Sequence, residues 1–475
     1  MKKILVGAVV LLALQTSCRD ELTVMPNDRL TIDNHYTTEN DFRKGLDYAY
    51  DAFKVSGYFS GDTSQMIVPD IVSDNLIQHP LGRRSNTSAY LFDFAANVGA
   101  VGNAYGATYG VVARANVVLS KLGNLSEGAA KKNFEAEARA IRAVAHFDNV
   151  IRYSKIPTQS GDANSSLGIA YIETFDPFQL VTRNLSVAEV YDKIIADLLF
   201  AEANITQTNV GRMNKAAVQG MLSRVYLYKG DYASAVTYGQ KSLASSSSVG
   251  SLANFKKIWT DDSTDGVLFK ISNSAVENIK TGSMYNQTLA GQIRSEYVVD
   301  YSLFTKYSNN DIRKSAYILT SPYEGKEYNH VIKYRQATGK PIEAVDVKYL
   351  RTAEVVLNTA EAAYRNGDQA LALQLLNKLR KDRYEGYTDG TESGDALLSA
   401  ILLERRLELA FENDRFFTLK RLGLPVQRSE FGPEANGAGI PASVKVLEAS
   451  SYKWQWPIPQ GAINNNPAIV QNPGY

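Results

Sequence analysis

The feature that most constrains the fold is a pair of helical patterns within residues 214–243. Apolar residues from Ala217 to Tyr228 recur at the three- and four-residue spacing that places side chains on one face of an α-helix. Gly230-Asp231 interrupts this pattern, which restarts at Tyr232. The stretch therefore predicts two helices joined by a tight turn. Because one helical hairpin cannot bury its apolar face alone, several hairpins must stack into a continuous core.

The hairpin resembles a tetratricopeptide repeat, since Tyr226, Gly230-Asp231-Tyr232 and Ala235 match the aromatic, turn and small positions of that pattern. A weaker copy spans 351–380, with Asn366-Gly367-Asp368 as its turn. We therefore predict a mainly α fold, a tetratricopeptide-like scaffold of helical hairpins over about 103–244 and 345–422 with minor β structure. Further helices are predicted at 41–55, 103–122, 132–153, 187–203 and 396–422.

Three long stretches lack helical periodicity. They are rich in Gly, Ser, Asn and Asp but also in aromatic residues. Loops longer than about 15 residues in a compact chain are usually functional or disordered, and the aromatic content favours order here. Short alternating runs such as 267–271 predict small sheets. We expect the three stretches to form the ligand-binding regions: 57–102, 244–344 and 423–475.

The N-terminus has the layout of a secretory signal. Lys2 and Lys3 precede an apolar run from Ile4 to Leu14, which is too short to span a bilayer, and a small polar segment leads to Cys18. Cys18 is the only cysteine of the chain, so it cannot form an internal disulfide. We predict a lipoprotein signal peptide at 1–17, a lipid anchor on Cys18 and a single domain at 18–475. The alternative is an ordinary signal peptide with an incidental cysteine.

The net charge and the tyrosine content indicate which classes of ligand the protein can bind. The formal net charge of +1 argues against a nucleic-acid-binding or polybasic membrane surface. Tyrosine is unusually frequent, at 28 residues against 17 phenylalanines. Its ring stacks and its hydroxyl hydrogen-bonds, which suits the binding of sugars or peptides, although many tyrosines will simply pack between helices.

Several sequence blocks are spread along the whole mature chain. They include residues 105–119, EARAIRA at 137–143, residues 183–201, YLRTAE at 349–354, ERRLELAFE at 404–412, WPIP at 456–459 and QNPGY at 471–475. Each block alone is weak, but together, and in this order, they resemble the SusD/RagB family of nutrient-binding outer-membrane lipoproteins.

The resemblance implies four tetratricopeptide-like hairpins with a ligand site on the opposite, loop-rich face. It implies an outer-membrane, surface-exposed protein without enzymatic activity. Its partner would be a TonB-dependent SusC-like transporter, to which it delivers glycans or, in some members, peptides.

The residues themselves give little support to catalysis or cofactors. No two of the four histidines have a spacing suited to a metal site, and His146 lies in a helical pattern typical of the core. Gly99, Gly102 and Gly106 lack the strand and the Lys-Ser/Thr of a phosphate loop. Glu404, Glu408 and Glu412 recur every four residues, which permits a hydrolase using these carboxylates. The arginines among them, however, favour ion pairs. We predict no metal, no cofactor and no enzyme.

Three functions are compared: glycan capture, which the loop asparagines and tyrosines favour, peptide capture on the same architecture, and hydrolysis. Sugar recognition needs aromatic faces together with amide, carboxylate and guanidinium groups that bind hydroxyls in pairs. Side chains of these kinds in the first two loop stretches are our candidate ligand contacts. They are Asp74, Arg83, Arg84, Asn86, Tyr90, Phe92, Asn97, Asn273, Tyr285, Asn286, Arg294 and Tyr297.

Overall fold

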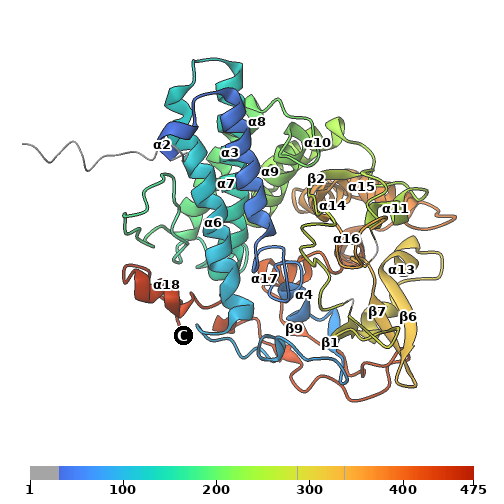
Figure 1. Cartoon of the computed structure of the whole chain (residues 1–475). Helices are drawn as coiled ribbons and strands as arrows, with labels where there is room; N and C mark the ends of the chain where they lie inside the picture. Colours follow the sequence, from blue (N-terminus) through green and yellow to red (C-terminus); the bar gives the residue numbers. More distant parts are fainter. Residues whose placement is uncertain (1–31, 286, 336) are drawn as a thin grey trace, which may run out of the picture.

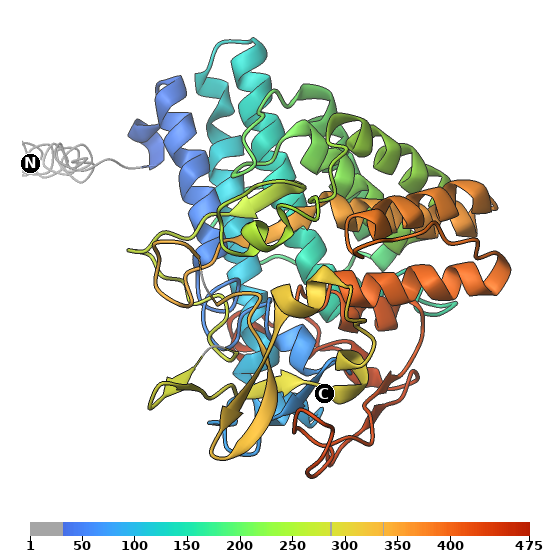
Figure 2. The ribbon, with the colours of Figure 1, turned by 90° about the vertical axis from the view of Figure 1, so that its right-hand side faces the viewer.

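Helices gather in one part of the molecule, and strands and loops gather in the other (Figures 1 and 2). The computed structural model describes residues 32–285, 287–335 and 337–475. The predictions for the signal peptide 1–17, for Cys18 and for Asn286 therefore lie outside the described residues. In this part of the chain, no helix is both long enough and apolar enough to cross a membrane.

The two predicted hairpins are present, and their turns explain why. Gly230 ends the first helix of one hairpin with a left-handed φ of 84°, and the Asp231 side chain then accepts a hydrogen bond from the Ser234 N–H at 3.1 Å. The second turn repeats this device with Gly367, at φ 89°, and Asp368, which accepts from the Leu371 N–H at 3.0 Å. The hairpins comprise α9 (Lys215–Lys229) with α10 (Tyr232–Ser245), and α14 (Thr352–Arg365) with α15 (Gln369–Lys381).

Longer helices pack beside these hairpins and complete the scaffold (Figure 1). Two of them begin with capping boxes, Thr38 with Asp41 and Ser186 with Glu189. The predicted helices at 41–55, 103–122, 132–153 and 187–203 are all confirmed, with shifted ends. The helices are α2 (Ile32–His35), α3 (Glu39–Asp51) extended by η2 (Ala52–Lys54), α6 (Gly99–Lys121) followed by η3 (Leu122–Asn124), α7 (Ala129–Tyr153) and α8 (Val187–Asn204).

The predicted single helix at 396–422 was wrong. The chain forms α16 (Gly394–Glu408) and α17 (Arg415–Arg421), and the segment between them contains Phe411 and Asn413, both with φ near +66°. That conformation is unfavourable for a bulky residue such as Phe411. The buried carboxylate of Asp70 stabilises it by accepting the N–H groups of Phe411 at 3.2 Å and Asn413 at 2.9 Å.

The loop-rich part contains short elements and antiparallel strand pairs in the described residues, as predicted. The strand predicted at 267–271 is β2, paired with β8. The short helices are α4 (Val68–Ile71), α5 (Thr87–Tyr90), α11 (Phe255–Trp259), α12 (Tyr301–Phe304), α13 (Ile312–Tyr317), η4 (Tyr452–Trp454) and α18 (Gln460–Asn465). The strand pairs are β1 (Leu76–Gln78) with β5 (Tyr297–Val299), β2 (Val267–Ile271) with β8 (Val347–Arg351), β3 (Thr288–Leu289) with β4 (Gln292–Ile293), β6 (Ile318–Tyr323) with β7 (Lys326–Val331), and β9 (Val426–Gln427) with β10 (Val446–Leu447).

The C-terminal tail returns to the helical scaffold. The Asn472 side chain donates to the backbone oxygens of Tyr153 at 2.8 Å and Trp456 at 2.7 Å, and its own oxygen accepts from Arg183 at 2.7 Å. Asn472 thus joins the end of α7, the loop before α8 and the tail. This contact gives a structural role to the QNPGY block at the end of the sequence.

Candidate functional site

A polar cavity of about 690 Å³ opens where the first and second loop stretches meet. Two of the predicted ligand contacts, Arg83 and Arg294, line it from different stretches. Its volume lies within the range of small-molecule sites. We call it the polar cavity; its lining residues are Ser56, Gly61, Asp62, Thr63, Arg83, Asn103, Lys280, Ser283, Gln287, Thr288, Leu289, Arg294 and Glu343.

Arg83 is fixed at the cavity wall by two carboxylates. Its Nη2 lies 2.9 Å from Asp62 Oδ2 and 2.6 Å from Glu296 Oε1, and its Nε donates to Glu296 at 2.9 Å. The other oxygen of Asp62 accepts from the Ser283 hydroxyl at 2.7 Å. These bonds hold the guanidinium in one orientation while nearly half of its side chain remains exposed, at 47%. Arg83 is therefore preorganised rather than mobile.

Two other cations of the cavity have no such restraint. Among the described residues, the side chains of Arg294 and Lys280 make no hydrogen bond or ion pair. Glu343 faces the same space, and its partial burial raises the pKa of its carboxyl, while Lys280 lowers it to a smaller extent. Positively charged donors and a carboxyl acceptor are thus both available to a polar ligand.

Six predicted contacts are buried in the structure, where they pack inside the loops. Tyr285 and Tyr297 have no exposed surface, and Tyr297 donates its hydroxyl to the Ser85 oxygen at 2.8 Å. Asp74 is paired with Arg415 at 2.7 Å. These side chains support the loops from inside and present little or no surface to a ligand in this conformation. The six are Asp74, Tyr90, Phe92, Asn273, Tyr285 and Tyr297.

The remaining predicted contacts are dispersed. Asn86 has a left-handed φ of 58° and donates to the Asp62 backbone oxygen at 2.7 Å, so it supports the cavity from behind. Arg84 and the edge of Tyr90 line a different cavity of about 530 Å³ beside residues 433–443. Asn97 is exposed just before α6 and lines neither cavity. Among the predicted contacts that the structure describes, Arg83 and Arg294 line the polar cavity together and the others do not line it.

Several cavity residues escaped sequence reasoning, although the loop stretches contain them. Asp62, Lys280, Gln287 and Glu343 stand in no periodic pattern, and only the folded loops bring them together. Asn103 lies in α6, at the start of a helix assigned to the scaffold. The glycine before Asp62 was a local sequence signal for a turn, and Gly61 does adopt a left-handed φ of 75° there.

The glutamates proposed as a possible acid/base group are engaged in ion pairs. Glu408 is fully buried, and its oxygens lie 2.7 Å from both Arg351 and Arg383, so these guanidinium groups hold the pKa of the carboxyl well below its usual range. Glu404 contacts Arg313 at 2.6 Å. The expected ion pairs exist, but the cations come from other elements and not from the neighbouring Arg405 and Arg406. Glu412 also lies beyond the end of α16, so the three carboxylates share no helical face.

His146 is a core residue, as predicted. Its Nδ1 lies 3.0 Å from the Arg142 backbone oxygen and its Nε2 accepts from the Ile172 N–H at 3.1 Å. Complete burial lowers the pKa of the imidazole to about 3. The histidine is therefore neutral and fully hydrogen-bonded. Across the described residues, no group of three His, Cys, Asp or Glu side chains is placed to hold a metal ion.

Comparison with known proteins decides the family. A model described as "SusD family" matches residues 232–475, which is just over half of the chain. The chain belongs to the SusD family. A second model, described as "Starch-binding associating with outer membrane", matches residues 65–227. The resemblance seen in the sequence is thus confirmed.

Similar proteins extend over the whole chain. SusD-like protein P2 of Formosa agariphila is 24% identical over the full length of both chains. A solved structure described as a putative sugar binding protein from Bacteroides vulgatus is 25% identical, with a TM-score of 0.79 over 93% of this chain and 99% of that one. A surface glycan-binding protein A from Bacteroides uniformis, at 20% identity, has a TM-score of 0.70 over 92% of this chain and 99% of that one. The last likeness shows the fold alone.

Proposed function

We propose that this SusD family member is a cell-surface lipoprotein that captures an oligosaccharide in the polar cavity and delivers it to a TonB-dependent SusC-like transporter. It acts by binding and carries out no chemistry on the ligand. The alternative is the same architecture used for peptide uptake.

The meeting of Arg83 and Arg294 in the polar cavity is the observation that carries this proposal. The Nε and Nη2 groups of Arg83 are bonded to Glu296 and Asp62, which leaves its fixed Nη1 group to donate to the hydroxyl oxygens of a sugar. Arg294 and Asn103 add further donors around the same space. The Glu343 carboxylate supplies an acceptor for hydroxyl protons. The cavity thus offers the mixture of polar groups that sugar hydroxyls require.

The family description and the descriptions of the relatives also support glycans. One matching family model is named for starch binding, and the similar B. vulgatus structure is named as a putative sugar binding protein. The peptide alternative rests on the charges of the cavity, because Asp62 and Glu343 face three cations and such a site also suits the two ends of a zwitterion. An affinity comparison is needed to separate the two.

The binding site is tested by titration calorimetry of the mature protein with panels of neutral oligosaccharides and oligopeptides. We expect at least one oligosaccharide to bind and to be recovered unchanged, with Arg294→Gln weakening its affinity about tenfold, the loss of one charge-assisted bond of about 1.5 kcal/mol. Arg114→Gln is the matched control. Arg114 belongs to the scaffold helix α6, where its guanidinium lies over the ring of Tyr48, and it does not line the cavity. Binding of oligopeptides alone would favour the alternative, and cleavage of the sugar would overturn both.

The anchor and the transporter partner are tested in cells. Cys18→Ser should release the protein from the membrane fraction, because an acylated cysteine is the only anchor proposed here. Full membrane retention of that variant would contradict the lipid anchor. Co-purification of the wild-type protein with a TonB-dependent barrel, identified by mass spectrometry, would support the partner.

A further inference from the structure

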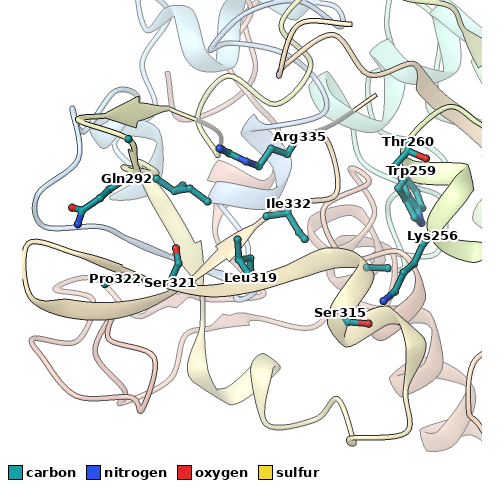
Figure 3. Close-up of a pocket in the computed structure, with 13 residues that line it drawn as sticks. Lys256, Trp259, Thr260, Gln292, Ser315, Leu319, Ser321, Pro322, Ile332 and Arg335 are labelled. Atoms are coloured by element: carbon teal, nitrogen blue, oxygen red, sulfur yellow. The ribbon is translucent and has the colours of Figure 1, made fainter. Parts of the chain in front are cut away.

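A second cavity, of about 540 Å³, lies on the other side of the β3–β4 hairpin (Figure 3). Thr288 and Leu289 of β3 line the polar cavity, whereas Gln292 and Ile293 of β4 line this one. We call it the tryptophan cavity. Its lining residues are Lys256, Trp259, Thr260, Gly291, Gln292, Ile293, Ser315, Ala316, Leu319, Ser321, Pro322, Ile332 and Arg335.

The walls of the tryptophan cavity combine an apolar surface with positive charge. Ile293, Leu319 and Ile332 provide apolar surface, and Leu319 is exposed to 41% although it lies on a strand. Lys256 and Arg335 bring cationic groups to the same space, as Figure 3 shows. No Asp or Glu is among the described lining residues. The polar cavity differs, since Asp62 and Glu343 are part of its wall.

Trp259 supplies a rigid donor. Its ring is 97% buried, packed edge-on against Tyr317 at 5.5 Å and Tyr334 at 6.0 Å, with the Lys333 ammonium 4.3 Å from its ring centroid. Its indole N–H nevertheless has no hydrogen-bond partner among the described residues. A buried donor without an acceptor is costly and rare, so it calls for an explanation. A ligand oxygen in the cavity that Trp259 lines would supply the acceptor.

The hydroxyl of Ser321 is likewise buried without a hydrogen-bond partner among the described residues. It lies on β6, two residues after Leu319, so both side chains project from one face of the strand. Two residues that line this cavity therefore each carry a polar atom without a partner among the described residues.

We propose that the tryptophan cavity is a second ligand subsite that takes an anionic sugar, one whose ring carries a carboxylate or a sulfate ester. The apolar wall accommodates the C–H face of the ring, the indole N–H and the Ser321 hydroxyl bind its oxygens, and Lys256 and Arg335 attract its negative charge. This inference rests on the proposed function, because the same glycan would extend across the β3–β4 hairpin from one cavity to the other.

Charge is tested with matched sugars. Trigalacturonate, its fully methyl-esterified form and a sulfated galactose oligosaccharide are titrated into the mature protein at low ionic strength. We expect a charged sugar to bind more tightly than the neutral ester, and Lys256→Gln to reduce that preference about fivefold, the size of a solvent-exposed ion pair. The preferred probe shows whether carboxylate or sulfate is the natural group.

Lys257→Gln is the matched control. Lys257 lies beside Lys256 on the same helix and is also exposed, but it does not line the cavity. It changes the net charge equally, so a loss of affinity in both variants would indicate only long-range attraction and would overturn the proposal. Trp259→Phe keeps an aromatic ring and removes the N–H. It should weaken binding of the charged sugar, because a ligand oxygen loses its donor, while the melting temperature shows that the protein is still folded.

The outcomes separate this inference from the proposed function. If oligosaccharides bind and Arg294→Gln weakens them while Lys256→Gln has no effect on any charged sugar, the second subsite is wrong and glycan capture stands. Equal affinity for the charged sugars and the methyl ester also overturns the subsite. If no oligosaccharide binds at all, the proposed function itself fails. A Lys256-dependent affinity for acidic peptides alone would assign the cavity to a peptide ligand and overturn the sugar proposal.

Discussion

The helical scaffold and the loop-rich part of this protein are stabilised in different ways. The hairpins of the scaffold depend on contacts between residues close in sequence, such as the Gly230 turn with its Asp231 cap. The loop-rich part is held by charged contacts between residues far apart, such as Arg313 with Glu404 and Arg351 with Glu408. Local patterns therefore specify the scaffold, whereas the loops acquire their shape only when distant charges meet.

Breaking the buried charge cluster should have the largest effect on stability. Glu408 accepts bonds from both Arg351 and Arg383 with no exposure to solvent. Glu408→Gln removes the negative charge and leaves buried guanidinium groups uncompensated, which should cost ~3–5 kcal/mol of unfolding free energy. Urea unfolding measures it. Glu173→Gln, which breaks the exposed pair with Lys193, should change stability by less than ~1 kcal/mol.

A pH dependence should come from Asp70, which joins the loop-rich part to the break between α16 and α17. Burial raises the pKa of its carboxyl from 3.8 to about 7. The native state then holds a proton that the unfolded state has lost, so this contribution is complete below pH 4 and is lost as the pH rises to 7. It amounts to at most ~4 kcal/mol, from ~1.4 kcal/mol per pKa unit.

The test of Asp70 is urea unfolding of the wild type and of Asp70→Asn at several pH values. The amide cannot ionise, so the variant should lose less stability than the wild type between pH 5 and 8. Asp265→Asn is the control of opposite sign, because hydrogen bonds from Ser248 and its neighbours lower the pKa of Asp265 to about 2. Its stability should differ from that of the wild type by a constant amount at neutral pH, and the difference should shrink only at acid pH, where the wild type loses the contribution of this carboxylate. Parallel curves for Asp70→Asn and the wild type would contradict the assignment.

Close packing of the scaffold gives a smaller effect. A Cβ at Gly239 of α10 would lie 2.0 Å from the Thr359 hydroxyl of α14. Gly239→Ala should therefore force the two helices apart and cost ~1–3 kcal/mol, the usual cost of overpacking. Gly110→Ala in α6 is the matched control, because nothing lies within 4 Å of the added methyl group. It should stabilise by ~0.4–1 kcal/mol, and equal effects of the two changes would contradict this packing.

This difference between the two parts also explains which predictions from the sequence succeeded. Both hairpin turns were predictable because glycine and aspartate act within a few residues of where they stand. The break in the helix predicted at 396–422 was not, because its stabilising group, Asp70, is more than 300 residues away in the sequence.

The same limit applies to the candidate site. Arg83 and Arg294 could be chosen by residue type in an irregular stretch. Residue type could not show that Tyr285 points into the core while Lys280 faces a cavity. Partial burial of a tyrosine ring is favourable in either setting, so composition alone does not separate packing from recognition.

The smallest effect on stability should come from an arginine of the cavity, compared with an identical residue in the core. Arg383→Gln removes a guanidinium that bonds Glu408 and the backbone oxygens of Val249 and Gly250. It should cost ~3–5 kcal/mol by leaving Glu408 short of a partner. Arg294→Gln removes the same group from a position without a partner in the described residues, and should change unfolding free energy by less than ~0.5 kcal/mol. If Arg294→Gln proved as destabilising as Arg383→Gln, the guanidinium of Arg294 would belong to the framework and could not be counted as a free donor of the polar cavity. A stable Arg294→Gln protein with weakened ligand affinity would instead separate recognition from folding at a single residue.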